Sequence, residues 1–256
     1  MDEANTAKTD LIIGRNAVLE ALQSGRAIDS VMVARGERTG SIGKILRLCR
    51  DKGIVVKEVD EKKLSFSCGH ANHQGVAAWT AAHDYAEVED IFALAEARGE
   101  QPFIIVCDEL EDPHNLGAIL RSAEAAGAHG VIIPKRRSAS LSFAVAKASA
   151  GAIEYVPVAR VPNIPALLDD LKKRGVWIYA ADMGGTLWCD TDFGGAVALV
   201  IGSEGRGVGR LVKEHCDFVV SLPMAGKINS LNASVAAGIL MFEVAKQRLK
   251  NGGDGI

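Results

Sequence analysis

Apolar residues along the chain follow two spacings, each typical of one kind of secondary structure. Up to residue 80, apolar positions three and four residues apart predict helices, and short apolar runs predict strands. The predicted elements are a helix, a strand, a helix, a strand and a returning strand, over Ala17–Leu22, Ile28–Val33, Ile42–Cys49, Ile54–Val59 and Gln74–Trp79. We therefore expect a small α/β domain, followed by a polar connector with one amphipathic helix, Val88–Arg98.

From residue 102 to residue 250, nearly continuous apolar segments alternate with amphipathic ones. This alternation is typical of an α/β fold with a mostly parallel sheet covered on both faces. The predicted strands are Phe103–Cys107, Gly130–Ile133, Ile153–Val158, Val176–Ala180, Ala196–Ile201 and Phe218–Val220. The predicted helices are Leu116–Ala126, Phe143–Ala150, Ile164–Lys173 and Ser230–Leu249. Ligands of such sheets bind in the loops at the carboxyl ends of the strands.

Composition narrows the class of protein. The chain has 256 residues, 48% apolar and 24% charged, which supports a buried core and excludes disordered and fibrous proteins. No apolar run has the length of a membrane span, and the amino end lacks the pattern of a signal peptide, so we expect a cytoplasmic protein with no membrane partner. The five cysteines include no C-x-x-C pair, so we expect neither a metal site nor a disulfide framework.

Positive charge is concentrated near the amino end. The formal net charge is −3, but residues 10–57 contain nine basic and five acidic residues, a local net charge of +4 against −7 in the remainder. This distribution excludes a uniformly basic nucleic-acid binder and allows a basic face on the first domain. The candidates for nucleic-acid contact are Arg15, Arg47 and Arg50, of which the last two share a helix face. Solvated helix faces, the commoner case, would give the same distribution.

The first of three polar loops follows the predicted strand Phe103–Cys107. Asn115 in this loop is placed as the N-cap of the next helix, whose apolar stripe contains Leu116, Ile119, Leu120 and Ala123. Arg121 lies off that stripe, so it faces solvent or a cleft. A simple helix cap and a surface arginine would also account for these two residues.

The second polar loop, Gly202–Gly207, follows the predicted strand Ala196–Ile201. Its glycines would allow a ligand to approach backbone N–H groups. The loop lacks the Gly-Lys-Ser/Thr of a phosphate loop, Arg210 stands where a dinucleotide loop needs glycine, and Glu204 would repel a pyrophosphate. A plain tight turn is the alternative.

The third polar loop, Leu222–Asn232, leads into the last predicted helix. Ser230 or Asn229 would cap that helix and Asn232 would lie in its first turn. Capping alone would account for any one of these residues. Taken together, however, the three loops place amide, hydroxyl, carboxylate and guanidinium groups at strand ends of one sheet, without metal-ligand spacing or a Ser–His–Asp order.

These loops resemble, in order, the three motifs of the SpoU (TrmH-like) RNA ribose 2′-O-methyltransferases of the SPOUT superfamily. The matching segments are Asn115–Arg121, Ile201–Gly207 and Leu222–Ala236. The segment that begins at Leu11–Val18 is similar to the small substrate-binding domain of this family. Together, the two parts look most like the enzymes that methylate a guanosine ribose in the peptidyl-transferase loop of bacterial 23S rRNA.

The resemblance implies a domain order, an architecture and a cofactor. Residues 10–80 would bind the RNA substrate, residues 81–101 would form a linker, and residues 102–250 would form the methyltransferase domain. That domain would be an α/β sheet with a deep trefoil knot formed by the second and third motif loops. The resemblance also implies a homodimer and S-adenosylmethionine bound in the knot, held by backbone groups of Gly202, Leu222 and Leu231.

The same resemblance implies roles for the polar side chains. Arg121 would bind the substrate phosphate and stabilise the developing alkoxide, because a guanidinium is a poor base. Asn115 and Glu204 would orient Arg121. Ser230 and Asn232 would shape the loop around the cofactor and the nucleotide.

Other functions remain open at the level of sequence. Within the family, tRNA is the main alternative to 23S rRNA as the target. A non-catalytic RNA-binding assembly factor would use the same domains and bind RNA without depending on Arg121. A nicotinamide-dependent oxidoreductase is disfavoured, because the glycine pattern for a dinucleotide is missing.

Overall fold

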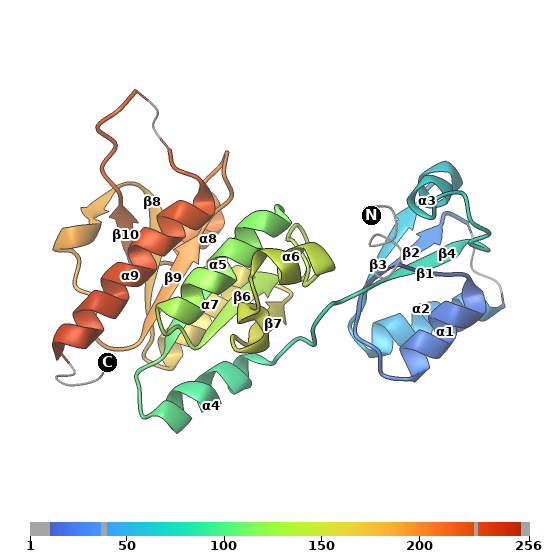
Figure 1. Ribbon diagram of the computed structural model, residues 1–256, viewed down its shortest axis with the longest axis horizontal. Helices are drawn as coiled ribbons and strands as arrows, with labels where there is room; N and C mark the ends of the chain where they lie inside the picture. The colour runs from blue at the N-terminus through green and yellow to red at the C-terminus, as the bar shows by residue number, and fades with distance from the viewer. Residues whose placement is uncertain (1–10, 37–39, 228–229, 252–256) are drawn as a thin grey trace. The chain divides into compact units, whose positions relative to one another are not determined.

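The computed structural model describes residues 11–36, 40–227 and 230–251, which form two compact units (Figure 1). The first unit contains the described residues up to Asp84 together with Ser140–Phe143. The second contains Tyr85–Ala139 and the described residues from Ala144 on. Among these residues, one sheet of four strands and one of six are present, so each unit buries a core of its own.

The first unit is a mixed sheet with helices on both faces. Its strand order is β1-β4-β2-β3, with β2 parallel to β3 and β4 antiparallel to both β1 and β2. Side chains alternate between the faces along β2, so Val31 and Val33 pack with α1 and α2, while Met32 packs with α3. The elements are β1 (Leu11–Ile13), α1 (Arg15–Gln23), β2 (Ile28–Ala34), α2 (Ser41–Asp51), β3 (Val55–Val59), α3 (Glu61–Ser67) and β4 (Val76–Thr80).

The second unit confirms the predicted α/β fold with a mostly parallel sheet. Its strand order is β10-β8-β9-β5-β6-β7, and every neighbouring pair is parallel. The strands are β5 (Phe103–Cys107), β6 (Gly130–Pro134), β7 (Val158–Val161), β8 (Trp177–Leu187), β9 (Val197–Ile201) and β10 (Phe218–Ser221). The helices are α4 (Val88–Arg98), α5 (Pro113–Ala125), α6 (Phe143–Ala148), α7 (Ile164–Lys173), α8 (Arg210–Glu214) and α9 (Ala233–Asn251).

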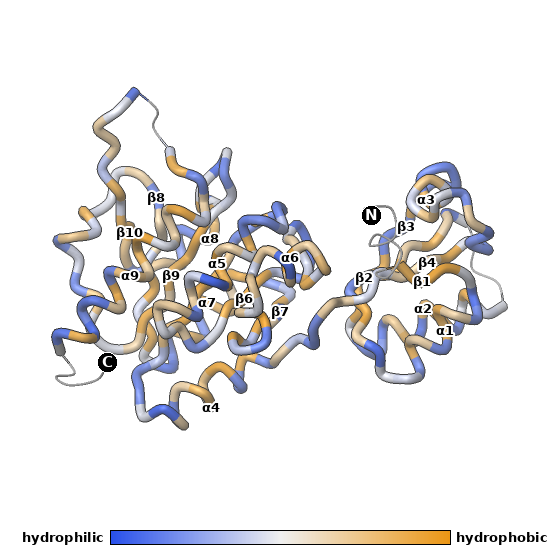
Figure 2. Tube along the Cα trace, viewed as in Figure 1, coloured by the Kyte–Doolittle hydropathy of each residue, from blue (hydrophilic) through white to orange (hydrophobic). Residues whose placement is uncertain are grey.

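The core of the second unit lies between this sheet and its covering helices. In Figure 2 the central strands are mostly hydrophobic and the loops that join them mostly hydrophilic. Ile91 of α4 is fully buried beside Ile104 and Val106 of β5, so the helix expected in the connector packs into this core. On the other side, α5 and α9 pack against each other. None of the described helices is both long and apolar enough to cross a membrane.

One predicted strand is wrong. The segment Ile153–Val158 was expected to be extended, but Ala152–Glu154 form a 3₁₀ turn and β7 begins only at Val158. Gly151 adopts a φ of +92°, which starts the turn, and Ile153 is buried by the turn rather than by a strand. The apolar pattern therefore predicted the burial of Ile153 correctly and the conformation of this segment incorrectly.

Candidate active site

The loop after β9 is closed by its own backbone. Ser203 and Gly207 exchange two hydrogen bonds, at 3.1 Å from Ser203 N to Gly207 O and 2.9 Å from Gly207 N to Ser203 O. Gly202 precedes this bridge, and a Cβ atom there would overlap with the backbone of Gly207 and Val208. The sequence predicted a small residue at 202, because a side chain there would meet a ligand or strain the turn; the structure shows the overlap with the backbone of the loop itself.

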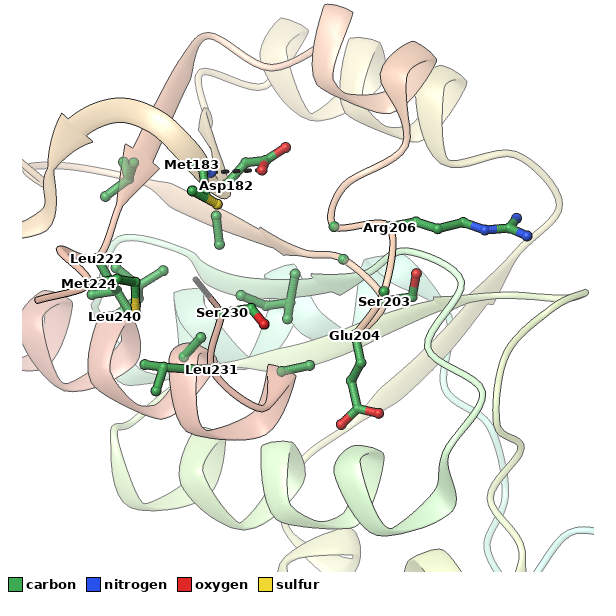
Figure 3. A pocket seen from close by; sticks show the side chains of 18 residues that line it. Asp182, Met183, Ser203, Glu204, Arg206, Leu222, Met224, Ser230, Leu231 and Leu240 are labelled. Carbon is green, nitrogen blue, oxygen red and sulfur yellow. Dashed lines mark hydrogen bonds between the residues drawn. The ribbon is translucent and has the colours of Figure 1, made fainter. Parts of the chain in front are cut away.

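A cavity of about 380 Å³, here called the β9 cavity, opens beside this loop (Figure 3). In the view of Figure 3, apolar side chains such as Leu222 and Leu240 lie at one side and Glu204 lies at the other. All three residues predicted to hold a cofactor line this cavity, as does the predicted catalytic residue Ser230. Its lining includes Asp182, Met183, Gly202, Glu204, Leu222, Met224, Ser230, Leu231 and Leu240.

Three of the predicted catalytic residues, here called the polar triad, form a closed hydrogen-bond network. Asn115 donates from Nδ2 to Glu204 Oε1 at 2.6 Å. Asn232 donates from Nδ2 to the same oxygen at 2.7 Å and to Asn115 Oδ1 at 2.9 Å. Two amides therefore hold the carboxylate of Glu204, one from each of the other two motif loops.

Asn232 has a second role that the sequence did not predict. Its Oδ1 accepts the N–H groups of Ser234 at 3.0 Å and Val235 at 3.3 Å, so Asn232 caps α9, which begins at Ala233. The prediction that Ser230 caps this helix is wrong, and Asn229 lies outside the described residues. By capping α9, Asn232 fixes the helix start relative to the carboxylate of Glu204.

Asn115 is not the cap of α5. Asp112 has that role: its side chain accepts the N–H of His114 at 2.9 Å, and Pro113 occupies the first helical position. Asn115 therefore falls in the first turn, where it is buried. Because the cap is supplied elsewhere, the amide of Asn115 is available to Glu204.

Arg121 is separate from the polar triad in this chain. It lies on the exposed side of α5, six residues beyond Asn115. No hydrogen bond or ion pair joins it to the residues that the structure describes, and it does not line the β9 cavity. The chain by itself brings together Asn115, Glu204 and Asn232, with Ser230 on the cavity wall, and leaves Arg121 outside the group.

The sequence also missed a carboxylate that organises this edge of the sheet. Asp108 follows β5, is buried, and accepts the N–H of Gly209 at 2.8 Å. Burial raises the pKa of this carboxyl above its usual value, and the hydrogen bond from Gly209 opposes the rise. The contact ties the end of β5 to the segment after the loop Gly202–Gly207. The described residues contain no group of three or more His, Cys, Asp or Glu side chains arranged to hold a metal.

In the first unit, the predicted basic residues lie at opposite ends of the sheet. Arg15 begins α1 at the carboxyl end of β2 and lines a cavity of about 380 Å³ together with Arg35. Its Nε donates to the carbonyl oxygen of Gln74 at 2.8 Å. Arg47 and Arg50 are exposed on α2, which runs toward the amino end of β3 because β2 and β3 are parallel. The structure therefore does not unite these three arginines in one patch.

A parallel sheet with a cavity and a polar network at its strand ends is the architecture of an α/β enzyme. The SpoU rRNA Methylase family matches residues 102–242, more than half of the chain, so the protein belongs to this family of SpoU/TrmH RNA methyltransferases. The family described as RNA 2′-O ribose methyltransferase substrate binding matches residues 11–86. The family resemblance drawn from the three motifs is confirmed.

Individual relatives are similar over nearly the whole chain. YacO of Bacillus subtilis, a candidate TrmH family tRNA/rRNA methyltransferase, is 50% identical over 240 residues, which cover 93% of this chain and 96% of YacO. A candidate of the same description from Staphylococcus saprophyticus is 45% identical, with the same coverage.

Solved structures of two methyltransferases share the fold. The AdoMet-bound rRNA methyltransferase of Sinorhizobium meliloti has a TM-score of 0.57 at 25% identity, covering 93% of this chain and 87% of that one. The SpoU methyltransferase AviRb of Streptomyces viridochromogenes, in complex with AdoMet, has a TM-score of 0.59 at 24% identity, covering 97% and 95%.

Proposed function

We propose that this protein transfers a methyl group from S-adenosylmethionine to a ribose 2′-hydroxyl of structured RNA in the cytoplasm, with a guanosine of 23S rRNA as the target. The observation that carries the proposal is the polar triad beside the β9 cavity. Residues from three separated motif loops meet there, and the matched family methylates RNA. The AdoMet-bound structure from Sinorhizobium meliloti supports the choice of cofactor.

The β9 cavity has the chemistry expected of a site for S-adenosylmethionine. Its volume of about 380 Å³ lies within the range of small-molecule sites. Leu222, Leu231 and Leu240 would cover apolar parts of the cofactor. Asp182 also lines the cavity, with its carboxylate paired to Lys213. The bound cofactor supplies an activated methyl group, so the protein needs mainly to orient and deprotonate the nucleophile.

The polar residues divide this work. Glu204 presents a carboxylate whose Oε1 is held by Asn115 and Asn232, while its Oε2 has no hydrogen-bond partner among the described residues. That free oxygen is placed to accept a hydrogen bond from the ribose hydroxyl. Arg121 would bind the substrate phosphate and stabilise the alkoxide, as the family motif implies. Ser230 would shape the cavity wall next to the reacting groups.

The proposal includes a homodimer and the trefoil knot that the family resemblance implies. Val235, Phe242 and Leu249 are each at least half exposed and recur every seven residues on α9, so they lie on one side of the helix. An exposed apolar stripe of this kind is typical of a face that another protein covers. A second copy could also bring Arg121 to a polar triad. Sedimentation equilibrium of the full chain measures whether the dimer forms.

Methyl transfer onto separated RNA pools tests the function. The protein is incubated with tritiated S-adenosylmethionine and either rRNA or tRNA, and the modified ribose is mapped. We expect label in 23S rRNA at a guanosine; label in tRNA would move the target, and RNA binding without label would favour the assembly factor. Arg121→Ala is expected to lower the rate by roughly 10²-fold or more, with an unchanged unfolding midpoint because the residue is exposed. A variant that keeps most of its rate would exclude this role for Arg121.

A further inference from the structure

A second cavity, here called the base cavity, lies on the other side of the loop Gly202–Gly207. It has a volume of about 470 Å³ and is lined by residues that follow β5 and β6, among them Glu109 and Arg137, and by Asn115, Glu204 and Arg206. Residues 203–206 line both cavities, so this loop is their common wall. A ligand in the base cavity would therefore meet a cofactor in the β9 cavity at the side chain of Glu204.

An ion pair crosses the base cavity. Glu109 follows β5 and Arg137 follows β6, and Arg137 Nη1 donates to Glu109 Oε1 at 2.5 Å. The two loops are also joined by a backbone hydrogen bond, from Ala139 N to Leu110 O at 2.7 Å. The backbones of the two partners are thus tied together at neighbouring strand ends, while the side chain of Glu109 is half-buried and that of Arg137 is largely exposed.

The backbone at both partners is unusual. Glu109 has a φ of +52° and Arg137 a φ of +54°, a left-handed conformation that costs energy for residues other than glycine. Residues in this conformation persist only where the surrounding structure enforces it, and they cluster at active sites and ligand-binding sites. Glu109 Oε2 and Arg137 Nε make no hydrogen bond with the described part of the chain, so both groups retain capacity for a ligand.

We propose that the Glu109–Arg137 pair reads the guanine base of the target nucleotide; this inference rests on the proposed function. A carboxylate accepts hydrogen bonds from the N1–H and 2-amino groups of guanine, and a guanidinium donates to its O6. These groups lie on the Watson–Crick edge of the base, where adenine presents no pair of adjacent donors. The lining has more carboxylates than guanidinium groups: Glu109, Glu111, Asp112 and Glu204 against Arg137 and Arg206. The resulting negative charge favours a neutral base over a phosphate in this cavity. Bases in unpaired RNA are commonly read on this edge.

Binding of mononucleotides tests the inference without requiring methyl transfer. The full chain is titrated with guanosine, inosine and adenosine 5′-monophosphates, and saturation-transfer NMR reports contact with the base. We expect guanosine monophosphate to bind roughly tenfold tighter than the adenosine nucleotide, with inosine monophosphate between them because it lacks the 2-amino group. Glu109→Gln is expected to reduce the preference for guanosine to near one, and Arg137→Ala to weaken it severalfold.

Glu89→Gln is the matched control. Glu89 accepts from Arg174 Nη2 at 2.8 Å, so this change also removes the charge from a glutamate–arginine pair, but Glu89 does not line the base cavity. Equal binding of the three nucleotides, or a guanosine preference that survives Glu109→Gln in a folded variant, would overturn the inference. Methyl transfer mapped to a ribose other than that of a guanosine would overturn it while leaving the methyltransferase function intact. Guanosine-selective binding without methyl transfer would instead contradict the proposed methyltransferase function and leave the base-reading inference intact.

Discussion

The two units of this protein place functional groups in the same kind of position and organise them differently. Both have parallel strands whose carboxyl ends carry polar residues. In the second unit, Asn115, Glu204 and Asn232 converge on one carboxylate oxygen. In the first unit, Arg15 and Arg50 lie at opposite ends of a sheet. A reaction needs groups fixed within a fraction of an ångström, whereas attraction to an RNA backbone tolerates dispersed charges.

Strand order produces this difference. β5 and β9 are neighbours in the sheet, and Cys107 of β5 pairs with Ile201 of β9 although 94 residues separate them. The loops that follow these two strands therefore emerge side by side, which brings Asn115 to Glu204. In the first unit, the described connection between β2 and β3 contains α2, and the positions of its arginines are set by helix geometry rather than by the order of the strands.

The largest expected effect comes from the loop that separates the two cavities of the second unit. Gly202→Val should abolish S-adenosylmethionine binding by calorimetry, because any Cβ atom at 202 overlaps with the backbone at 207 and 208 and must displace the loop. Gly205→Ala is the control, because residue 205 lies in the same loop and a Cβ atom there would meet nothing within 4 Å. The affinity of this variant for S-adenosylmethionine should be unchanged. A folded Gly202→Val protein with normal affinity would place the cofactor outside the β9 cavity.

The sequence predicted the members of the site better than their arrangement. Alternating apolar segments predicted the parallel sheet, and family motifs named Asn115, Glu204 and Asn232. The sequence did not predict that Asp112 rather than Asn115 caps α5, because an Asp-Pro pair and an asparagine three residues later are both acceptable helix starts. Hydrogen bonds between residues 89 and 117 positions apart have no local signature in a single sequence.

The basic residues of the first unit show a second limit of prediction from sequence. Local charge counting identified the amino-terminal segment as basic and could not show that Arg50 lies at the opposite end of the sheet from Arg15. The pair Glu109–Arg137 was missed altogether, because a left-handed φ at a glutamate and an arginine leaves no compositional trace. A backbone conformation that is set by tertiary contacts is therefore difficult to predict from a single sequence.

A smaller effect would measure how tightly the polar triad is coupled. Asn115→Ala and Asn232→Ala should each lower the rate constant kcat, and the double variant should be little worse than the poorer single variant, because both amides hold the same oxygen of Glu204. The interaction energy in this cycle is expected to be about 0.5–3 kcal/mol. Asn115→Ala combined with Glu89→Gln should be additive, because Glu89 pairs with Arg174 and shares no partner with the triad. Additive losses for the two asparagines would mean that they act independently.

The smallest effects are expected in the first unit, where Arg47 and Arg50 are exposed on α2. Each exposed arginine should contribute roughly the worth of one surface charge pair, so removal of Arg47 or Arg50 should weaken RNA binding about threefold and removal of both about tenfold. A variant with fewer phosphate contacts releases fewer counterions when it binds RNA. The slope of log affinity against log salt concentration should therefore flatten by somewhat under one unit per arginine. Affinity for S-adenosylmethionine should not change, since neither residue belongs to the second unit.

The control for total charge lies on the opposite face of the first unit's sheet. Lys62 and Lys63 are exposed on α3, which covers the face opposite α2, so Lys62→Ala with Lys63→Ala removes the same charge from a different surface. If RNA is bound along α2, the arginine pair should lower the affinity and the salt slope while the lysine pair leaves both nearly unchanged. Equal losses would mean that only the overall charge of the unit matters. No loss from the arginine pair would show that α2 is a solvated face, and RNA binding by this unit would then have to be sought around Arg15, at the opposite end of the sheet from Arg50.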